Sequence, residues 1–600
     1  MPPVTAEMAV VFLIAAAALL LFVTELVPAD VTALMVMVAL IVLGPFTQIS
    51  PEEGVSGFSN EATITVLAML VLSFGITKTG AVQRLGERMV SFAGTDQRRQ
   101  LLATLAVAGV PSGILNNTPI VTMLMPVISD MADQGGTSPS KLLIPLSYAS
   151  MTGGMLTLIG TSTNLVASDV AGRLIGRPFS MFEFTALGAI VFVTSAVYLA
   201  TVGYRLLPER VSPGEDLVAE YELGDYLTEV VVEGDSPVVG RTVEDAFEDS
   251  PVDFDILQLI RNGEPFVDPL GEDVRAGDLF VVRVGLDSLR GLMTTEGLSF
   301  VPTATVTEEE LRPNEKQRTL VELVIPSWSS LVDQTLANVA FSQQYDATVL
   351  AIRRGSNILH HRMDQTHLRS GDTLLVQATE DALNRMAADR DFIVVREVSE
   401  PNYRTSKVPI ALVIIALVVG LAALGVVDIL VSALGGVVGM IVTGVIKPHE
   451  LYDGIEWNVI FLIAGLIPLG IAFEQTGAAD LLGALGAMSA DVLPPIGVLW
   501  LFYILTTLVT ALISNSASVI LMLPIAVETA NRVGADAFAF VLAVTFAASA
   551  DFVTPIGYQT NLLVYGPGGY RFTDYFRVGA PLQVLLSIVT VLGIAALWGV

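Results

Sequence analysis

Long apolar runs alternate with short polar stretches toward both ends of the chain, and a stretch rich in acidic residues lies between them. Apolar runs of this length are typical of helices that cross a lipid bilayer. They predict five spans in each half, at residues 9–27, 29–46, 62–79, 142–172 and 183–206 and at residues 407–427, 430–446, 456–475, 537–565 and 578–599. The pattern therefore predicts a polytopic α-helical membrane protein.

Two further apolar stretches are each split by a small polar cluster. Residues 101–132 carry Asn116-Asn117-Thr118, and residues 496–531 carry Ser514-Asn515-Ser516. Each stretch is too long for a loop, and non-helical backbone at membrane depth survives only where it faces protein or a watery cavity. We expect each stretch to form a re-entrant hairpin that enters the membrane and leaves by the same side.

The predicted span that follows each hairpin contains a second polar break of the form Ile-Gly-x-x-Thr-Asn. It begins at Ile159 in the first half and at Ile556 in the second. The spacing between the copies is nearly constant, 515 − 117 = 398 and 561 − 164 = 397. Polar breaks repeated at matching depth in two apolar halves are typical of a transporter site.

The distribution of Lys and Arg gives the orientation of the spans. With the N-terminus outside, thirteen of these residues fall in inner loops and three, Arg173, Arg177 and Arg532, fall in outer loops. This predicts that both termini lie outside and that the acidic domain is cytoplasmic. Because each half has an odd number of spans, residues 1–210 and 401–600 should form an inverted repeat. The first run lacks a basic leader and a cleavage site, so we interpret it as a span and not a signal peptide.

Composition supports a membrane protein with an acidic soluble insert. Of 600 residues, 52% are hydrophobic and 15% are charged, and the absence of Cys excludes disulfides and cysteine catalysis. Residues 211–400 hold 36 Asp or Glu against 15 Lys or Arg, so no basic face for nucleic acid is evident. Only five of the 31 basic residues are Lys. A salt-adapted prokaryotic source fits this composition, and an ordinary acidic cytosolic surface explains it equally.

The polar breaks are rich in Ser, Thr, Asn and Gly, and their bends free backbone carbonyl groups. Such oxygen ligands suit Na⁺, while the N-termini of the half-helices after Asn117 and Asn515 suit an anion. Asp551 is the one charged side chain beside them. These residues could instead hydrogen-bond between packed helices, but four breaks in register across two halves favour a binding site.

The polar clusters are each followed by an apolar run into Leu124-Met125-Pro126 or Met522-Leu523-Pro524. They resemble the paired signatures of the divalent anion:Na⁺ symporter family, and the resemblance covers residues 9–206 and 407–599. It implies two sodium sites related by pseudo-symmetry, one anion between the hairpin tips, an elevator-like motion and a homodimer in the bilayer.

The resemblance also implies roles for individual residues. The first sodium site would use Ser112, Asn116, Asn117 and the Gly160 carbonyl, the second would use Thr510, the Ile513 carbonyl, Asn515 and Gly557, and the anion would contact Asn117, Thr118, Asn515, Ser516, Ser162 and Gln559. Ser162-Thr163 and Gln559-Thr560 replace the Pro-Pro pair common in dicarboxylate carriers. These added donors favour a sulfate-like oxyanion over a dicarboxylate.

The acidic insert contains two similar units, residues 211–305 and 306–400. The sequence Arg275-Ala276-Gly277-Asp278 is echoed by Arg369-Ser370-Gly371-Asp372, and each precedes a strand-like run. The units resemble a pair of TrkA-C (RCK-C) modules, which are small α+β domains of ion transporters. This implies a small cytosolic ligand, with a dimerising spacer as the alternative. No Gly-x-Gly-x-x-Gly motif indicates a nucleotide-binding half.

These features predict sodium-coupled uptake of a divalent anion across the cell membrane, with no enzymatic chemistry. Three alternatives stay open: a di- or tricarboxylate symporter, an RCK-gated cation channel or transporter, and a membrane sensor that binds an anion without moving it. The segment Thr201-Val202-Gly203-Tyr204 is similar to a potassium filter but lacks a pore helix. His360, His361 and His367 fall in a polar turn, which favours a solvated loop over a metal site.

Overall fold

The computed structural model describes most of the chain. The residues outside it are 1–3, 25, 212–226, 233–235, 248–253, 262–263, 267–270, 285–297, 301–317, 356, 360–362, 380–381, 384, 387–388, 390 and 396–402. All statements about structure refer to the remaining residues. His360 and His361 therefore lie outside the described residues, and the description of the central domain covers its sheets and the elements beside them.

The first half of the chain is helical. Its elements are α1 (Ala6–Thr24), α2 (Ala29–Val42), α3 (Gly44–Thr47), α4 (Pro51–Val55), η1 (Ser56–Ser59), α5 (Glu61–Thr79), α6 (Ala81–Ala93), α7 (Gln97–Ser112), α8 (Asn117–Gln134), α9 (Ser140–Gly154), α10 (Ser162–Ile175), α11 (Thr185–Tyr198), the π-helix η2 (Leu199–Gly203) and α12 (Tyr204–Leu206). The filter-like segment lies in η2 and the start of α12, so its backbone is helical.

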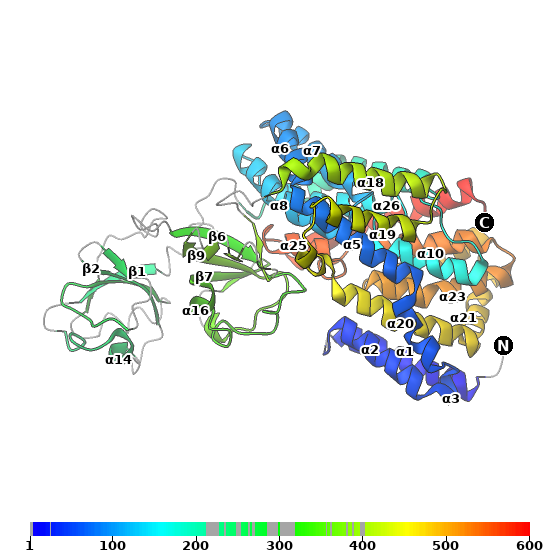
Figure 1. Ribbon diagram of the computed structural model, residues 1–600, viewed down its shortest axis with the longest axis horizontal. Coiled ribbons are helices and arrows are strands. Elements are labelled where there is room, and N and C mark those ends of the chain that lie inside the picture. Colours follow the sequence, from blue (N-terminus) through cyan, green and yellow to red (C-terminus); the bar gives the residue numbers. More distant parts are fainter. Residues whose placement is uncertain are drawn as a thin grey trace.

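The second half is also helical and contains a comparable series of elements. They are η5 (Thr405–Lys407), α18 (Val408–Ala423), α19 (Ile429–Val442), η6 (Pro448–Glu450), η7 (Tyr452–Gly454), α20 (Trp457–Gln475), α21 (Ala478–Ala487), η8 (Met488–Asp491), α22 (Pro495–Thr510), α23 (Asn515–Val533), α24 (Ala537–Ser549), α25 (Gln559–Tyr565) and α26 (Phe572–Leu597). Figure 1 shows these helices gathered into one body with the central sheets at one end.

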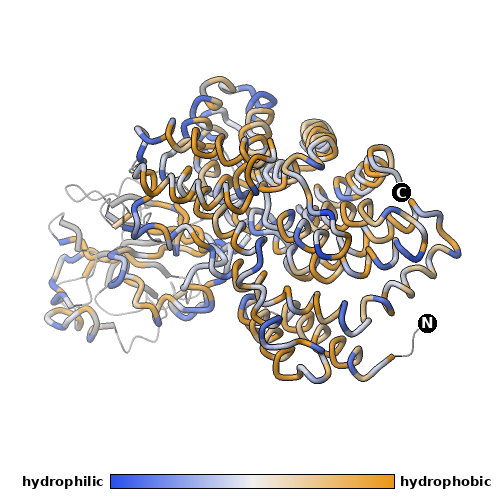
Figure 2. The backbone as a smooth tube through the Cα atoms, turned by 45° about the vertical axis from the view of Figure 1, so that its right-hand side comes forward, coloured by the Kyte–Doolittle hydropathy of each residue, from blue (hydrophilic) through white to orange (hydrophobic). Residues whose placement is uncertain are grey.

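The helices have the length and hydropathy of membrane spans. Five helical segments are long and apolar enough to cross a bilayer: Pro51–Thr79, Thr185–Leu206, Thr405–Ala423, Trp457–Gln475 and Phe572–Leu597. Hydrophobic residues dominate the helical body, whereas the central domain contains both hydrophobic and hydrophilic segments (Figure 2). These features confirm the prediction of a multi-pass α-helical membrane protein.

Helices from the two halves pack against each other around the centre of the body. The helix α2 packs on α20, and α5 packs on α19. Similarly, α8 contacts α25, and α10 contacts α23. The helix α8 begins at the polar cluster of the first half and lies beside α25, which begins at the break of the second half. Likewise, α23 begins at the polar cluster of the second half and lies beside α10, which begins at the break of the first half.

Two amphipathic helices were not predicted from the sequence. The helices α6 and α21 follow directly after α5 and α20, and each is preceded by a glycine with left-handed backbone, Gly80 at φ 69° and Gly477 at φ 75°. A residue with a side chain rarely adopts this conformation. The two helices pack on α8 and α23, so each one supports the arm of a hairpin.

The central domain contains two five-stranded antiparallel sheets. The first is formed by β1 (Leu227–Val232), β2 (Phe254–Arg261), β3 (Glu264–Phe266), β4 (Leu279–Val284) and β5 (Leu298–Phe300), and the second by β6 (Arg318–Val324), β7 (Ala347–Arg354), β8 (Asn357–Leu359), β9 (Thr373–Thr379) and β10 (Ile393–Val394). The orders are β3-β2-β4-β1-β5 and β10-β6-β9-β7-β8. When the second order is written in reverse, as β8-β7-β9-β6-β10, each strand takes the place of its counterpart in the first sheet, in the same succession along the chain.

The repeated Arg-x-Gly-Asp sequences form the same turn in both sheets. Asp278 accepts a hydrogen bond from the Arg275 amide and pairs with Arg261, while Asp372 accepts from the Arg369 amide and pairs with Arg354. Burial alone would raise the pKa of Asp278, but its bonds to Arg261 and the backbone lower it. The motif therefore holds a turn in place. No group of three His, Asp or Glu side chains that could hold a metal occurs within the described parts of the chain.

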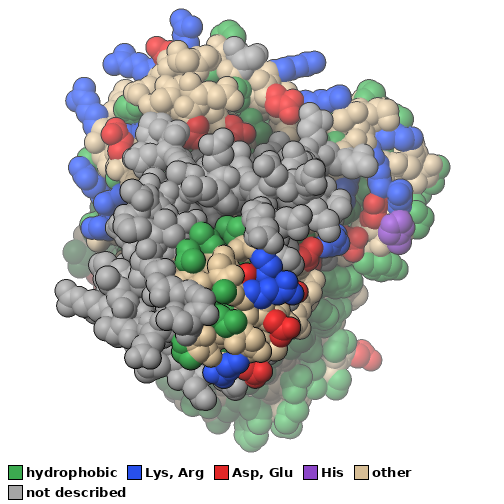
Figure 3. All heavy atoms as spheres, turned by 90° about the vertical axis from the view of Figure 1, so that its left-hand side faces the viewer, with side chains coloured by type: hydrophobic (Ala, Val, Ile, Leu, Met, Phe, Trp, Pro, Cys, Tyr) green, Lys and Arg blue, Asp and Glu red, His purple; other side chains and the backbone are tan. Residues whose placement is uncertain are grey.

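The surface around the central domain carries basic side chains. In Figure 3, which faces the end of the molecule that bears this domain, Lys and Arg side chains project from the rim of the helical body. The segment from α6 to the start of α7 lies at this end in Figure 1 and contains Arg84, Arg88, Arg98 and Arg99. The acidic domain and a basic rim therefore occupy the same end of the molecule.

Candidate functional site

Both polar breaks interrupt a helix and are closed by an asparagine in the same way. The break between α9 and α10 is held by Asn164, whose Nδ2 donates to the carbonyl oxygens of Gly154 at 3.2 Å and Thr157 at 2.9 Å. The break between α24 and α25 is held by Asn561, whose Nδ2 donates to the carbonyl oxygens of Asp551 at 3.0 Å and Thr554 at 3.1 Å. The contacts span the same ten and seven positions in each copy.

The first hairpin tip brings backbone carbonyl groups close to the first break. A Cβ atom on Gly160 would lie 2.5 Å from the Gly154 carbonyl oxygen and 2.8 Å from that of Ser112. Such a contact is too short for any side chain, so glycine is required at position 160. Thr157 also donates a hydrogen bond from its hydroxyl to the Gly113 carbonyl. The break and the hairpin tip thus present several carbonyl oxygens within a small space.

Asn117 lies at the centre of this arrangement. Its side chain is 1% exposed, and Nδ2 donates to the Tyr558 hydroxyl at 2.6 Å. The Oδ1 atom has no hydrogen-bond partner. A buried amide oxygen without a partner is costly unless a ligand uses it, because it has lost its hydrogen bonds to water. Asn117 therefore offers a free oxygen toward the first break, where a Cβ on Gly154 would lie 2.8 Å from it.

A second contact joins the first hairpin to the second break. The Thr118 hydroxyl donates to Gln559 Oε1 at 3.1 Å. Thr118 is buried at the start of α8, and Gln559 is the first residue of α25. Together with the bond between Asn117 and Tyr558, this contact places two of the predicted anion ligands side by side.

The second hairpin tip is tied to the end of α24. Thr510 Oγ1 lies 2.9 Å from Asn515 Oδ1 and 3.0 Å from the Ala548 carbonyl oxygen. Thr510 and Ser516 are buried, whereas Asn515 is half-buried. The predicted pair Thr510 and Asn515 is thus in direct contact. No hydrogen bond among the described residues joins Asn515 to Asn117, and the two hairpin tips meet through the breaks and not directly.

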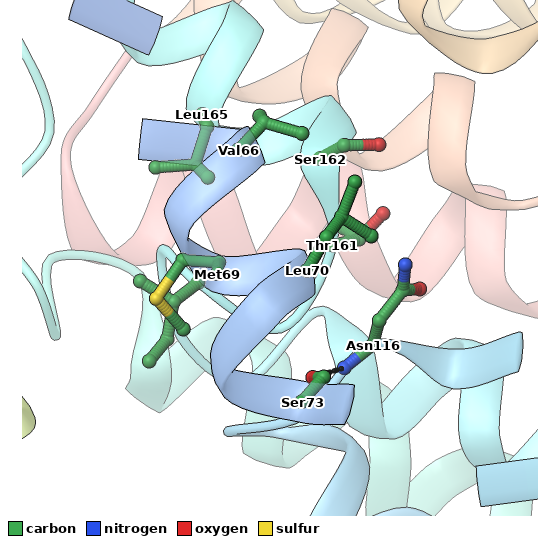
Figure 4. A pocket seen from close by; sticks show the side chains of 9 residues that line it. Val66, Met69, Leu70, Ser73, Asn116, Thr161, Ser162 and Leu165 are labelled. Carbon is green, nitrogen blue, oxygen red and sulfur yellow. Dashed lines mark hydrogen bonds between the residues drawn. The ribbon is translucent and has the colours of Figure 1, made fainter. Parts of the chain in front are cut away.

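A small cavity lies beside the first break. Its volume is about 20 Å³, and its polar lining is formed by Ser73, Asn116, Thr161 and Ser162. In Figure 4 the polar ends of Asn116, Thr161 and Ser162 turn away from Met69 and Leu165. The Asn116 amide donates to Ser73 Oγ at 3.2 Å. The cavity has room for one water-sized group. It brings Asn116 and Ser162, which the sequence assigned to different ligands, to one place.

Several residues of the site were missed from the sequence. Ser73 lies in the long apolar helix α5, where a single serine carries little signal, and Tyr558 lies in the variable part of the second break. Ile513 and Gly557 lie at the second hairpin tip and the second break, and no described hydrogen bond joins their carbonyls to Thr510 or Asn515. A Cβ on Gly557 would overlap Oδ2 of Asp551. Asp551 thus occupies the space in front of that glycine.

The charge of the site is unusual for one that would hold an anion. The predicted ligands include no Lys, Arg or His. The helices α8, α10 and α23 each begin at the site, at Asn117, Ser162 and Asn515. Their N-terminal amides provide partial positive charge without a basic side chain. Amide and hydroxyl oxygens beside them can bind a hard cation.

Comparison with known proteins gives consistent matches over most of the chain. The family profile "CitMHS: Citrate transporter" matches residues 19–545. "Uncharacterized transporter sll0640" of Synechocystis sp. is 42% identical over 592 residues, which cover 97% of this chain and 96% of that protein. "Sodium/sulfate cotransporter 1" of Chlamydomonas reinhardtii is 23% identical over 743 residues, which cover 90% and 84%. The crystal structure of the YdaH transporter of Alcanivorax borkumensis aligns with 97% of this chain at 14% identity and a TM-score of 0.43.

Proposed function

The chain belongs to the citrate transporter family, and we propose that it is a sodium-coupled symporter that imports a divalent anion, with a sulfate-like oxyanion preferred. The observation that carries the proposal is the contact of the first hairpin with the second break through Asn117–Tyr558 and Thr118–Gln559. It gathers neutral donors and one free amide oxygen at a site without basic side chains. The relatives named sodium/sulfate cotransporters support the choice of ions.

Two sodium ions would bind at the two hairpin tips. The first would use Ser112, Asn116, Asn117 and Gly160, a set supported by the close approach of Gly160 to the Ser112 carbonyl. The second would use Thr510, Ile513, Asn515 and Gly557, supported by the contact between Thr510 and Asn515. Both sets consist of neutral oxygens at bent backbone, which suit a hard monovalent cation.

The anion would bind between the tips, at Asn117, Thr118, Asn515, Ser516, Ser162 and Gln559. In the structure Thr118 donates to Gln559, so each of the two groups is the hydrogen-bond partner of the other. An oxyanion would take both the Thr118 hydroxyl and the Gln559 amide as donors in place of this bond. Short neutral donors favour a compact oxyanion such as sulfate. The description of the family as citrate transporters keeps a di- or tricarboxylate as the alternative cargo.

Transport would follow alternating access by an elevator-type movement. We propose that residues 1–210 and 401–600 form an inverted repeat, so that one hairpin opens to each side of the cell membrane. The basic rim around the central domain supports a cytoplasmic location for that domain and an external location for both termini. Sodium binding would order the hairpin tips, complete the anion site and permit the inward movement. We further propose that two copies of the chain form a homodimer.

The central domain would regulate this movement as a pair of TrkA-C (RCK-C) modules that bind a small cytosolic ligand. Its second sheet touches the half-helix that carries Gln559. A Cβ on Gly355 would lie 2.5 Å from the Tyr565 hydroxyl, and one on Gly371 would lie 2.9 Å from Leu562. Val324, Ile393 and Val395 also belong to the apolar core of the helical body. A ligand that moved the second sheet would therefore act on α25 directly.

Uptake into proteoliposomes tests the proposal. An inward sodium gradient should drive accumulation of radiolabelled sulfate, and replacement of external sodium by choline should abolish it. Citrate and succinate, tested as labelled substrates in the same vesicles, distinguish the alternative cargo. Asn117→Ala and Asn515→Ala should each abolish uptake while the protein stays folded, with Asn357→Ala at the exposed first position of strand β8 as the control. Equal uptake in choline would contradict sodium coupling.

A further inference from the structure

Two buried oxygen atoms beside the second break have no hydrogen-bond partner. They are Oδ2 of Asp551 and Oγ of Ser549, and both residues are 2% exposed. No Lys, Arg or His forms an ion pair with Asp551 in the part of the chain that the structure describes. A carboxylate removed from water without a counter-charge is strongly unfavourable. The Asp551 carboxylate is therefore suited to a positively charged ligand.

The position of Asp551 has a definable counterpart in the first break. Asn561 donates to the carbonyl of Asp551, ten positions earlier, just as Asn164 donates to the carbonyl of Gly154. Position 551 thus corresponds to position 154. At Gly154 the absence of a side chain leaves room for the Asn117 amide, since a Cβ there would lie 2.8 Å from Asn117 Oδ1. The free oxygen of the first break comes from a neutral amide, and that of the second comes from a carboxylate.

Oxygen atoms of the kind that bind a cation lie on the residues that precede Asp551 and at the second hairpin tip. The Oδ2 atom of Asp551 faces the Cα of Gly557, where any Cβ would overlap it. The preceding residues of the break contribute the free Ser549 hydroxyl and the Ala548 carbonyl oxygen, which lies 3.0 Å from Thr510 Oγ1. Thr510 in turn contacts Asn515. Hydroxyl, carbonyl and carboxylate oxygens are the ligands that hard cations prefer.

We infer that Asp551 is a charged ligand of the second cation site, so that the two cation sites differ in charge. This inference rests on the proposed function, in which Thr510, Asn515 and Gly557 hold a sodium ion. A carboxylate attracts a cation strongly in a medium of low dielectric constant, whereas neutral oxygens do so weakly. The second site therefore fills with sodium before any anion binds. The first site, which has neutral ligands, fills once the anion adds its negative charge.

Sodium binding to the whole purified protein in detergent tests this order directly. With ²²Na⁺ in sulfate-free buffer of constant ionic strength, the wild type should bind one sodium ion per chain, and a second should bind when sulfate is added. Absence of sodium binding without sulfate would overturn the inference. So would simultaneous binding of both ions only in the presence of sulfate. This measurement needs no variant and does not depend on uptake.

The substitution Asp551→Asn removes the charge and keeps the size and the carbonyl oxygen of the side chain. It should raise the half-saturating sodium concentration, read from thermal stabilisation without sulfate, by at least about tenfold. Asp551→Ser provides a second neutral variant, and Glu528→Gln removes a charge from the Glu528–Arg532 pair on the hairpin arm α23, so it should leave sodium dependence unchanged. A sodium dependence within about twofold of the wild type in either neutral variant would reject Asp551 as a ligand.

The outcomes separate this inference from the proposed function. If the wild type accumulates sulfate with sodium and Asp551→Asn keeps its sodium dependence, the transporter proposal stands and the role of Asp551 fails. If sodium stabilises the wild type but not Asp551→Asn, and no sulfate is taken up, the cation site stands and the assignment of the cargo fails.

Discussion

Asn117 at the tip of the first hairpin donates a hydrogen bond to the hydroxyl of Tyr558 in the second break, at 2.6 Å and across 441 positions of the chain. The bond fixes the orientation of the Asn117 amide, and with it the direction in which the free Oδ1 points. One half of the chain thereby positions a predicted ligand in the other half. The site is therefore a joint property of both halves.

The substitution Tyr558→Phe removes this bond and leaves Asn117 Nδ2 without its partner. Loss of a partner for a buried polar group costs about 1 to 3 kcal/mol, and the bond lost here is the one that fixes the orientation of the Asn117 amide. We expect sodium-dependent sulfate uptake to fall by about tenfold or more. Uptake in proteoliposomes checks this. Tyr204→Phe, which removes an exposed bond to Gln97, is the control. Wild-type rates in Tyr558→Phe would exclude the bond from the site.

Gly160 and Gly557 are the positions at which added volume should be least tolerated. A methyl group on Gly160 meets backbone carbonyls of Gly154 and Ser112, and one on Gly557 meets the Asp551 carboxylate. The contacts of Gly160 are with backbone, which cannot shift as the end of a side chain can, whereas a Cβ on Gly557 would overlap Asp551 Oδ2 and would displace this buried carboxylate. Gly160→Ala and Gly557→Ala should therefore each abolish uptake and lower the melting temperature.

Gly435→Ala provides the matched control for these two variants. Gly435 lies in α19, and nothing lies within 4 Å of a Cβ built on it. Alanine stabilises a helix by about 0.5 to 1 kcal/mol relative to glycine, so this variant should retain uptake and melt at the same or a higher temperature. Equal behaviour of all three variants in the thermal assay would show that the close approaches at Gly160 and Gly557 do not constrain the fold.

The absence of Cys allows a direct test of the contact between the central domain and α25. A Cβ on Gly566 would lie 3.4 Å from the Cβ of Thr373, close to the separation found in disulfides. It would also lie 2.8 Å from the Gly371 carbonyl oxygen, so the single variant Gly566→Cys is first compared with the wild type for melting temperature and uptake. The double variant Thr373→Cys with Gly566→Cys should therefore cross-link on oxidation. If the second sheet must release α25 for transport, oxidation should reduce uptake at least about tenfold, and a reductant should restore it.

The single-cysteine variants control for this experiment, because oxidation should leave their uptake unchanged. Mass spectrometry of peptides confirms that the cross-link has formed. A cross-linked protein that transports at the rate of the reduced form would indicate that the second sheet moves together with α25. In that case the contact does not restrain the movement, and regulation through it would be excluded.

Much of the helical architecture could be predicted because long apolar runs, and the polar residues that end or interrupt them, are a strong local signal for membrane helices. The span expected at 62–79 is observed as α5 at Glu61–Thr79, and the span expected at 456–475 is observed as α20 at Trp457–Gln475. The Gly-Asp turns of the central domain were also evident, since Gly277 and Gly371 both adopt φ 84°. Such features depend on a few adjacent residues, and a local pattern can encode them.

Features that depend on distant residues could not be predicted in this way. The helix α6 carries Arg84, Glu87 and Arg88 on its exposed face, and hydropathy alone does not distinguish such a short charged helix from an inner loop. Tyr558 and Ser73 enter the site only because hairpins and breaks from different parts of the chain meet. The residues of each sodium site stay predictions that the uptake and sodium-binding measurements address. The inverted repeat and the identity of the central modules also stay predictions.

An ion pair near the start of α20 gives a dependence of stability on pH. Glu450, in the short helix η6 outside the spans, accepts hydrogen bonds from Arg404 at 2.6 and 2.8 Å. This partner lowers the pKa of Glu450 from an ordinary value of 4.5 to about 2. A lowered carboxylate pKa stabilises the folded state above the ordinary value, and the contribution disappears as the pH falls toward about 2.

The substitution Glu450→Gln should therefore destabilise the protein by about 1.5 to 3 kcal/mol at neutral pH, because hydrogen bonds to charged groups are worth about that much. Thermal unfolding in detergent between pH 7 and pH 3 measures the effect. The difference in melting temperature between wild type and variant should be constant down to about pH 4.5 and shrink below it. Glu87→Gln on the exposed face of α6 should show no such difference. A difference that grew on acidification would have the wrong sign for a carboxylate that its arginine partner keeps ionised.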